Sequence, residues 1–406
     1  MNIHRAFVAL AGATVLSTSG TRLSAIAIPW LVLTTTGSPV LTGLAGFAEM
    51  LPYVLAKALG GPLIDRIGAR RIAIWCDYLS TIGVALVPLF YWAGLLSIWV
   101  LLPSVALIGA LRAPSDAAKQ ALVPTVAALG KVPLERVTGV MGASDRLAGT
   151  VGAAAAGGLI ALLGPAPALL ANAVAFLLSA LVVAIGIPRH EAPARDRSTS
   201  YRTELAAGWT VLRSDPVLRA LVIMIAITNL FDQAYATVLL PVWVRTAGLD
   251  VTWVGIFLAA FSGASIVGAG IAAAIGERLP RLTVYTIGFL CAGPMPLAIF
   301  AMDAALPVLV GVLVVSGFAA GFLNPILGVI LFERIPSAMV GRVIALFGAL
   351  AWGLMPFGGL YAGLLVDNLG IVVALGITGL LYLLATLAPV AIPSFRQMRR
   401  KPLVPA

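Results

Sequence analysis

The sequence has little charge. Only 10% of its 406 residues are Asp, Glu, Lys or Arg, and 61% are hydrophobic. Ordinary soluble domains contain about 25% charged and about 45–50% apolar residues. A soluble fold of this composition would expose a mostly apolar surface, because too few polar side chains are present to cover it. The shortage of charge therefore excludes a soluble enzyme, a nucleic-acid-binding protein and a disordered chain, and it predicts a helical protein that crosses a membrane repeatedly.

Cysteine and histidine are also scarce. Cys76 and Cys291 lie far apart within apolar runs, so we expect two unpaired thiols and no disulfide framework. His4 and His190 are too few for a metal site or an intramembrane protease, and we expect neither a metal nor a cofactor. The Gly-Lys pair at 130–131 lacks the other residues of a phosphate-binding loop, so the sequence does not predict ATP hydrolysis.

Apolar runs long enough to span a bilayer follow one another along the chain. A transmembrane helix needs about 20 apolar residues, whereas the strands of a membrane barrel show short alternating segments. Twelve runs meet the helical requirement, and they cover residues 7–33, 40–64, 72–93, 98–117, 137–162, 167–188, 219–243, 251–275, 284–302, 307–331, 342–366 and 371–393. The predicted fold class is therefore an all-α polytopic membrane protein with twelve transmembrane helices.

The basic residues lie almost entirely on one side of these runs. One set of connecting segments carries 21 of the 26 Lys and Arg residues, and the other set carries one, Arg245. The positive-inside rule then predicts that both termini are cytoplasmic. This distribution accounts for the net charge of +10 without a nucleic-acid partner. We expect a multi-pass protein of the bacterial cytoplasmic (inner) membrane.

A polar stretch divides the twelve runs into two sets of six. Within it, residues 204–213 have amphipathic helical spacing, which predicts a helix lying on the inner membrane surface. The sequence thus predicts an N-terminal six-helix bundle over 1–188, a cytoplasmic linker over 189–218, a C-terminal six-helix bundle over 219–394 and a basic cytoplasmic tail over 395–406.

The segment after the second run carries a family signature. It reads Gly61-Pro-Leu-Ile-Asp65-Arg66-Ile-Gly68-Ala-Arg70-Arg71. This resembles the helix 2–3 signature of the major facilitator superfamily, G-x-L-a-D-r-x-G-r-k. The resemblance implies two pseudo-symmetric six-helix bundles and a cytoplasmic gate, whose motif residues here are Gly61, Asp65, Arg66, Gly68, Arg70 and Arg71, joined by Asp116.

The residue types of this segment suit a gate. Gly61 permits close helix packing, Gly68 allows a tight turn, and Asp65 can accept hydrogen bonds from basic neighbours or from a helix N-terminus. Asp77 and Asp116 lie near the predicted cytoplasmic ends of their helices. We expect these two carboxylates to form salt bridges with the basic cluster of the motif.

Other segments resemble bacterial drug and siderophore exporters, including Tap-like multidrug efflux proteins. They are 28–33, with Trp30, 114–124 and 204–221. The resemblance implies a secondary active transporter, acting as a monomer, that exports amphipathic small molecules such as drugs or natural products in exchange for protons by alternating access. The sequence departs from that branch where Arg22 replaces a helix 1 acid and where 153–158 lacks the proline of the exporter signature.

Other functions stay open. Within transport, the alternative is a dedicated exporter of a siderophore, lipid or metabolite. From other classes, an intramembrane enzyme or a non-transporting receptor remains. The apolar runs show no catalytic grouping of His, Ser and Asp at one depth, which disfavours an enzyme. The two halves share motifs in the same order, such as Gly157-Gly-Leu and Gly358-Gly-Leu, and a twofold repeat disfavours a receptor.

Charges inside the apolar runs identify candidate coupling residues, because a charge in the bilayer is costly and usually functional. At about 1.5 Å per residue, Arg22, Glu49 and Asp232 fall at about the same depth. An Arg beside a carboxylate favours its charged form, and loss of that contact favours proton uptake. We therefore expect Asp232 to carry the coupling proton, with Glu49 as the second candidate and Asp145 as a further one. Arg22 would control proton uptake by making and losing contact with Asp232 or Glu49. The alternative is a static ion pair.

Aromatic and amide side chains in the runs suggest an apolar pocket with a few polar groups. The predicted substrate-binding residues are Trp30, Tyr53, Asn229, Phe231, Gln233, Tyr235, Phe322, Asn324 and Trp352. Each aromatic residue alone is equally compatible with packing or with an interfacial anchor.

Overall fold

The computed structural model describes residues 5–188, 201–336 and 339–398, and the regular structure in these ranges is helical. The chain forms two compact units. The first contains residues 1–195, 236–259 and 359–367, and the second contains residues 196–235, 260–358 and 368–406. The predicted linker stretch 189–200 with His190, the tail residues 399–406 and His4 lie outside the described residues. The predicted domain boundaries stay a prediction.

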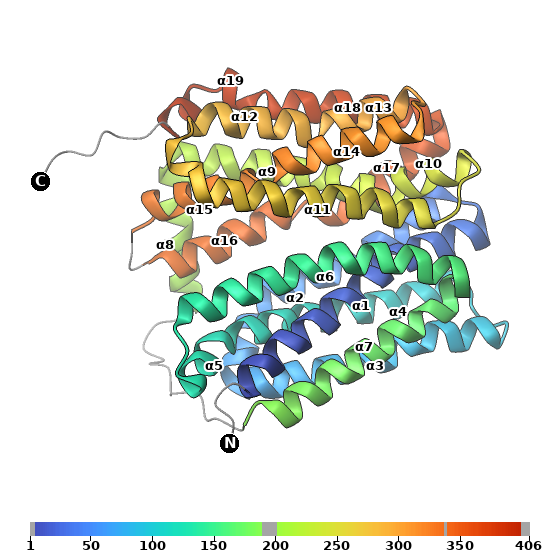
Figure 1. Ribbon diagram of the computed structural model, residues 1–406, viewed down its shortest axis with the longest axis horizontal. Coiled ribbons are helices and arrows are strands. Elements are labelled where there is room, and N and C mark those ends of the chain that lie inside the picture. The colour runs from blue at the N-terminus through green and yellow to red at the C-terminus, as the bar shows by residue number, and fades with distance from the viewer. Residues whose placement is uncertain (1–4, 189–200, 337–338, 399–406) are drawn as a thin grey trace, which may run out of the picture. The chain divides into compact units, whose positions relative to one another are not determined.

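The N-terminal part of the first unit consists of seven helices (Figure 1). They are α1 (Arg5–Thr36), α2 (Pro39–Ile67), α3 (Ala69–Trp92), α4 (Ile98–Ala121), α5 (Val123–Gly130), α6 (Leu134–Leu163) and α7 (Pro165–Gly186). Helix α1 packs against α6 and α7, α2 packs against α4, and α3 packs against α4 and α7. Leu10, Ala73, Val126 and Val183 are fully buried where α1, α3, α5 and α7 meet.

The rest of the chain forms shorter helices, several of which continue one another. They are α8 (Tyr201–Ser214), α9 (Pro216–Ala234), η1 (Tyr235–Leu239), α10 (Leu240–Thr246), α11 (Thr252–Ile275), η2 (Gly276–Arg278), α12 (Arg281–Ala292), α13 (Pro294–Ala301), α14 (Leu306–Ala320), α15 (Leu323–Arg334), α16 (Val340–Trp352), α17 (Met355–Leu369), α18 (Ile371–Thr386), α19 (Ala388–Ala391) and η4 (Pro393–Met398).

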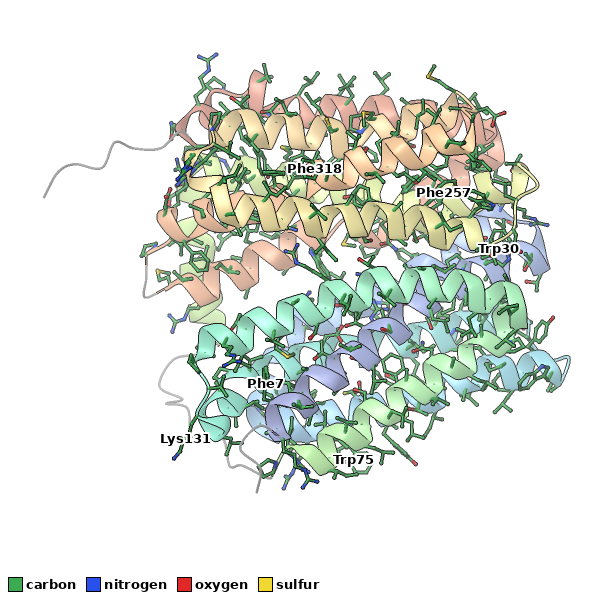
Figure 2. The ribbon with its side chains drawn as sticks, in the orientation of Figure 1. Phe7, Trp30, Trp75, Lys131, Phe257 and Phe318 are labelled. Atoms are coloured by element: carbon green, nitrogen blue, oxygen red, sulfur yellow. The ribbon has the colours of Figure 1, made fainter. Side chains whose placement is uncertain are left out.

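The helices account for the twelve predicted spans. Eleven segments among the described residues are long and apolar enough to cross a bilayer. Helix α1 is the twelfth; its 32 residues give it a length of about 48 Å. Large apolar side chains project outward, as lipid contact requires: Trp75 is 60% exposed, Trp99 79% and Leu162 84%. Figure 2 shows Trp75 on the outside of its helix. Cys76 and Cys291 are both free, as predicted.

Local sequence explains where the helices begin. Ser38 caps α2 by accepting a hydrogen bond from the Leu41 amide, and Pro39 takes the first position, where no amide donor is needed. Asp215 caps α9 in the same way through the amides of Val217 and Leu218.

The seventh predicted span is a helix with an internal irregularity. Its α-helical geometry is interrupted at η1, a π-helical turn, before it resumes as α10. Pro241 explains the disturbance, because proline has no amide hydrogen to donate to the carbonyl four residues earlier. The chain passes from the second unit to the first at this turn, between Tyr235 and Ala236. Single π-helical turns are frequent at functional sites.

Glycine allows α6 and the start of α11 to make backbone contact within the first unit. A Cβ atom on Gly255 would lie 2.7 Å from the Ala153 carbonyl oxygen and 3.0 Å from the Gly157 Cα atom. We expect Gly255→Ala to lower the free energy of unfolding by about 1–3 kcal/mol, because the backbones would have to move apart. Gly270→Ala on the same helix is the control, since nothing lies within 4 Å of its Cβ position. Equal thermal unfolding of the two variants in detergent would contradict this packing.

Candidate functional site

A buried ion pair joins α2 and α4 in the first unit. The Glu49 Oε1 atom accepts a hydrogen bond from Arg112 Nη1 at 2.6 Å, and both residues are 6% exposed. Gly109 makes this approach possible, because a Cβ atom there would collide with the Glu49 carbonyl oxygen. Two opposite charges removed from solvent are stable only as a well-formed pair. The pair therefore holds α2 and α4 in a fixed register.

Tyr53 extends this pair by one helical turn. The Arg112 guanidinium lies 4.3 Å from the centre of the Tyr53 ring. The Tyr53 hydroxyl donates to Asp116 Oδ2 at 3.3 Å, and the Lys57 ammonium lies 5.7 Å from the ring centre. The predicted substrate residue Tyr53 is thus part of a charged network, and the predicted gate residue Asp116 belongs to the same network.

The structure corrects the predicted partner of Glu49. Its carboxylate pairs with Arg112 and not with Arg22. Arg22 lies on α1 facing α6, where Gly149 and Gly152 are its neighbours. The depth count from the sequence places Arg112 in the inner half of its run, so it does not offer Arg112 as the partner of Glu49.

A second charged network lies inside the helix bundle of the first unit. Asp77 on α3 is fully buried and lies 2.8 Å from the Lys119 Nζ atom. It also accepts hydrogen bonds from the Ser115 hydroxyl at 2.5 Å and the Ser179 hydroxyl at 2.6 Å. The predicted pairing of Asp77 with the basic gate cluster is therefore wrong. The network joins α3, α4 and α7, and it fixes the helix that carries Arg112.

Sequence reasoning overlooked the partners of Asp77, although a signal for one of them is present. Helix α7 has two polar side chains, Asn172 and Ser179, in an otherwise apolar segment. They are seven residues apart and therefore share a helix face. Both are buried, and the Asn172 amide donates to the Ser24 hydroxyl. Buried polar side chains on one face indicate a polar contact inside the bundle.

The residues of the gate motif have separate surroundings. Gly68 lies between α2 and α3 with a φ of 94°, so the predicted tight turn is present. Arg70 donates from Nε to the Ile187 carbonyl and from Nη2 to the Ala184 carbonyl, both at 2.6 Å, and so caps the end of α7. Arg66 and Arg71 are exposed. The side chain of Asp65 lies outside the described residues.

One prediction for this motif is wrong. No described atom lies within 4 Å of the Cβ position of Gly61, so close helix packing does not occur there. Close packing of α2 occurs instead near its other end. Gly43 allows this close packing, because a Cβ atom there would collide with the Gly359 carbonyl oxygen within the first unit.

In the second unit, Asp232 lies on α9 with an exposed carboxylate. Its Oδ1 atom accepts a hydrogen bond from the Tyr382 hydroxyl at 3.0 Å. The Tyr382 ring also packs against Phe231 at 5.7 Å between ring centres. Among the described residues, no Lys or Arg nitrogen lies within 4 Å of the Asp232 carboxylate.

The other predicted substrate residues of this unit are dispersed over several contacts. The Asn229 amide donates to the Ala351 carbonyl at 2.9 Å, beside Trp352. Tyr235 packs on Phe300 at 5.9 Å, and Phe322 packs on Phe318 at 5.5 Å between ring centres. Gln233 is partly buried and Asn324 is exposed. In the first unit, Trp30 is partly buried near the end of α1.

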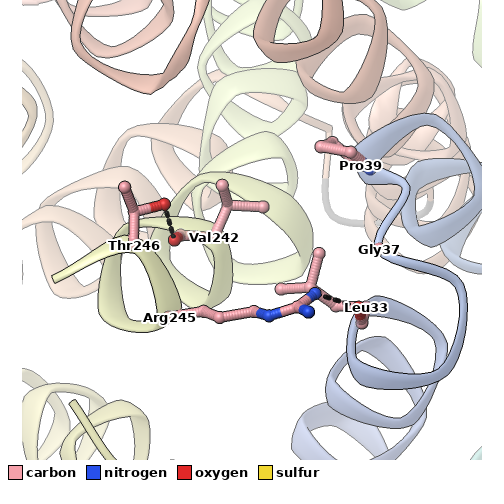
Figure 3. A pocket seen from close by; sticks show the side chains of 6 residues that line it. All are labelled: Leu33, Gly37, Pro39, Val242, Arg245 and Thr246. Atoms are coloured by element: carbon pink, nitrogen blue, oxygen red, sulfur yellow. Dashed lines mark hydrogen bonds between the residues drawn. The ribbon is translucent and has the colours of Figure 1, made fainter. Parts of the chain in front are cut away.

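A hollow of about 330 Å³ lies in the first unit at the end of α1 (Figure 3). It is lined by Leu33, Gly37, Pro39, Val242, Arg245 and Thr246. The Arg245 guanidinium donates to the Leu33 carbonyl, where a cation near a helix C-terminus is favourable. None of the predicted substrate residues lines this hollow. Its lining includes Arg245 and Leu33, which are joined by the capping hydrogen bond.

Comparison with known proteins gives a consistent family. The profile of the Major Facilitator Superfamily matches residues 10–360. The multidrug efflux pump Tap of Mycobacterium tuberculosis is 30% identical over 400 residues, which cover 96% of this chain and 94% of that protein. The multidrug efflux pump Tap of Mycolicibacterium fortuitum is 28% identical over 390 residues, covering 94% of each chain.

Solved structures agree on the fold. The nucleoside transporter NupG matches with a TM-score of 0.76 at 14% identity, over 98% of this chain and 100% of that one. A bacterial homologue of the lysosomal transporter Spinster, in an inward-facing unoccupied conformation, matches with a TM-score of 0.73 at 15% identity, over 99% of each chain. Similarity at these identities describes the architecture alone.

Proposed function

The chain belongs to the Major Facilitator Superfamily and is a membrane transporter, and from this premise we propose that it exports amphipathic small molecules, such as drugs or natural products, in exchange for protons. The similarity to multidrug efflux pumps of mycobacterial species supports the substrate class. Export by a monomer of the bacterial inner membrane, with both termini cytoplasmic, is part of the proposal. Labelling of a cysteine at residue 198 from outside intact cells would contradict this orientation.

The observation that carries the proton-coupling proposal is the Asp232–Tyr382 contact. Asp232 has a hydroxyl donor at 3.0 Å and, among the described residues, no cation within salt-bridge distance. It can therefore gain and lose a proton without breaking an ion pair. The Tyr382 hydroxyl can donate to the charged carboxylate or accept from the protonated one. Glu49 is the second candidate, since its protonation requires separation from Arg112 inside the bundle.

Substrate-induced proton flux in proteoliposomes tests the function. Purified protein is reconstituted with an internal pH dye, and a panel of amphipathic fluorescent compounds is added one at a time. We expect several compounds to release a stored proton gradient, and an imposed gradient of one pH unit to drive accumulation of about tenfold for one proton per substrate. Empty liposomes provide the control. If substrate accumulation does not depend on the imposed pH gradient, proton antiport is excluded. If no compound of the panel is transported, multidrug export is excluded.

A further inference from the structure

Arg22 is a charged side chain in the middle of α1 that the mechanism above does not use. It lies 17 residues from Arg5 and 14 from Thr36, or about 25 Å and about 21 Å from the two helix ends. Its side chain is exposed. In the part of the chain that the structure describes, it forms no hydrogen bond and no ion pair within 4 Å. A guanidinium at this depth is costly unless a ligand or water satisfies it.

The carboxylates near Arg22 form hydrogen bonds with other residues, although Asp145 keeps its negative charge and its second oxygen. Asp145 exerts the strongest attraction on Arg22, but its Oδ1 atom accepts a hydrogen bond from Thr18 at 3.0 Å. Glu49 is paired with Arg112 at 2.6 Å. Arg112 itself repels Arg22. The guanidinium therefore retains hydrogen-bond donors that no described side chain uses.

Two glycines of α6 lie beside Arg22. A Cβ atom on Gly149 would lie 3.6 Å from the Arg22 Nη2 atom and 3.7 Å from its Nε atom. A Cβ atom on Gly152 would lie 3.5 Å from the Arg22 Cβ atom. Glycine at both positions leaves room for Arg22 beside the α6 backbone, and the Arg22 side chain is exposed. A guanidinium with free donors binds a carboxylate through two parallel hydrogen bonds.

We propose that Arg22 is a binding site for the anionic group of the exported molecule, and that carboxylate-bearing amphipathic molecules are preferred substrates. This inference rests on the proposed export function and specifies its substrate class. The substrate carboxylate would accept hydrogen bonds from a guanidinium that no described residue contacts at hydrogen-bonding distance, while the apolar part of the substrate lies against the apolar helix surfaces. A neutral ester of the same molecule lacks the charge and is expected to bind less tightly.

Matched fluorescent probes test the proposal. Dansyl-phenylalanine carries a carboxylate, its methyl ester is neutral, and dansylcadaverine is a cation of similar size. We expect the wild-type protein to bind dansyl-phenylalanine at least tenfold more tightly than the methyl ester, in fluorescence titrations of the full-length protein in detergent. Arg22→Gln should remove this difference by weakening the carboxylate probe at least tenfold, with the ester unchanged. Arg22→Lys should retain an intermediate preference for the carboxylate probe, since lysine keeps the positive charge but cannot form the two parallel hydrogen bonds of a guanidinium.

Arg146→Gln is the control, because it removes the same charge from an exposed position on α6. It should keep the preference for the carboxylate. Equal affinity of the wild type for acid and ester would overturn the proposal, as would equal weakening of both probes by Arg22→Gln. Transport of the same probes in proteoliposomes separates the two levels of inference. If the carboxylate binds through Arg22 but no probe is transported, the export function fails while the site stands.

Discussion

Asp77→Asn should destabilise the protein by about 3–5 kcal/mol, because it removes the carboxylate charge that lies 2.8 Å from the buried Lys119 ammonium. Asn has nearly the shape of Asp. Its amide oxygen can accept a hydrogen bond from one of the two serine hydroxyls and its NH2 group can donate to the other, so the effect reports charge more than volume. Equilibrium unfolding in mixed detergent micelles measures the change. Asp303→Asn is the control, since Asp303 is exposed and Asn tolerates its positive φ of 50°.

The double variant Asp77→Asn, Lys119→Met is the decisive comparison. Replacing both members of a buried ion pair by neutral groups is often neutral or stabilising, whereas removing one member is costly. We therefore expect the double variant to recover most of the lost stability. A double variant as unstable as Asp77→Asn would mean that the two charges do not depend on each other, and the ion pair would not be what holds α3 to α4.

Asp232→Asn should abolish accumulation driven by a pH gradient and leave substrate binding intact. Asn has no proton to exchange, so a gradient of one pH unit that supports about tenfold accumulation in the wild type should support a ratio of about one. Exchange of labelled for unlabelled substrate across the membrane should continue, since it requires no net proton movement. Both assays use the same proteoliposomes, and direct binding is measured in detergent.

Two further variants make this result specific. Tyr382→Phe removes the hydroxyl donor and keeps the ring that packs on Phe231, so it should alter the pH dependence of transport while retaining coupling. Glu49→Gln tests the second carboxylate. If Asp232→Asn keeps full gradient-driven accumulation and Glu49→Gln loses it, the coupling proton is carried by the Arg112 pair and the assignment to Asp232 is wrong.

The twelve spans are predictable from the sequence because a lipid-facing helix needs a continuous apolar run, and such runs are visible without knowledge of tertiary contacts. The interruptions inside the runs are visible only in part. Proline accompanies each of three breaks: Pro294 follows Gly293 between α12 and α13, Pro325 lies four residues after Gly321, and Pro356 lies three residues after Gly353. The sequence does not show the packing beside such a break, as at Gly321, whose Cβ position lies 2.5 Å from the Ser265 carbonyl oxygen.

The candidate site is only partly predictable, for a geometric reason. Counting residues gives the depth of a side chain along its helix, but it does not give the direction in which the helix is rotated or which helix stands opposite. Glu49 is therefore placed at the right level with the wrong arginine, and Arg112 is found to be its partner from the structure. Asp77 illustrates the same limit, because its partners come from three positions separated by 38 to 102 residues in sequence.

The π-helical turn η1 has a mechanical consequence for the seventh span. A π turn is a position where a helix bends at low cost, since the regular series of backbone hydrogen bonds is already interrupted. Asp232 lies just before this turn, and Arg245, which caps α1, lies after it. The span therefore consists of two regular helical segments, α9 and α10, joined by a turn that bends at low cost. If Asp232 carries the coupling proton, as proposed, we expect the helix before η1 to change its tilt without breaking the contact between Arg245 and the Leu33 carbonyl.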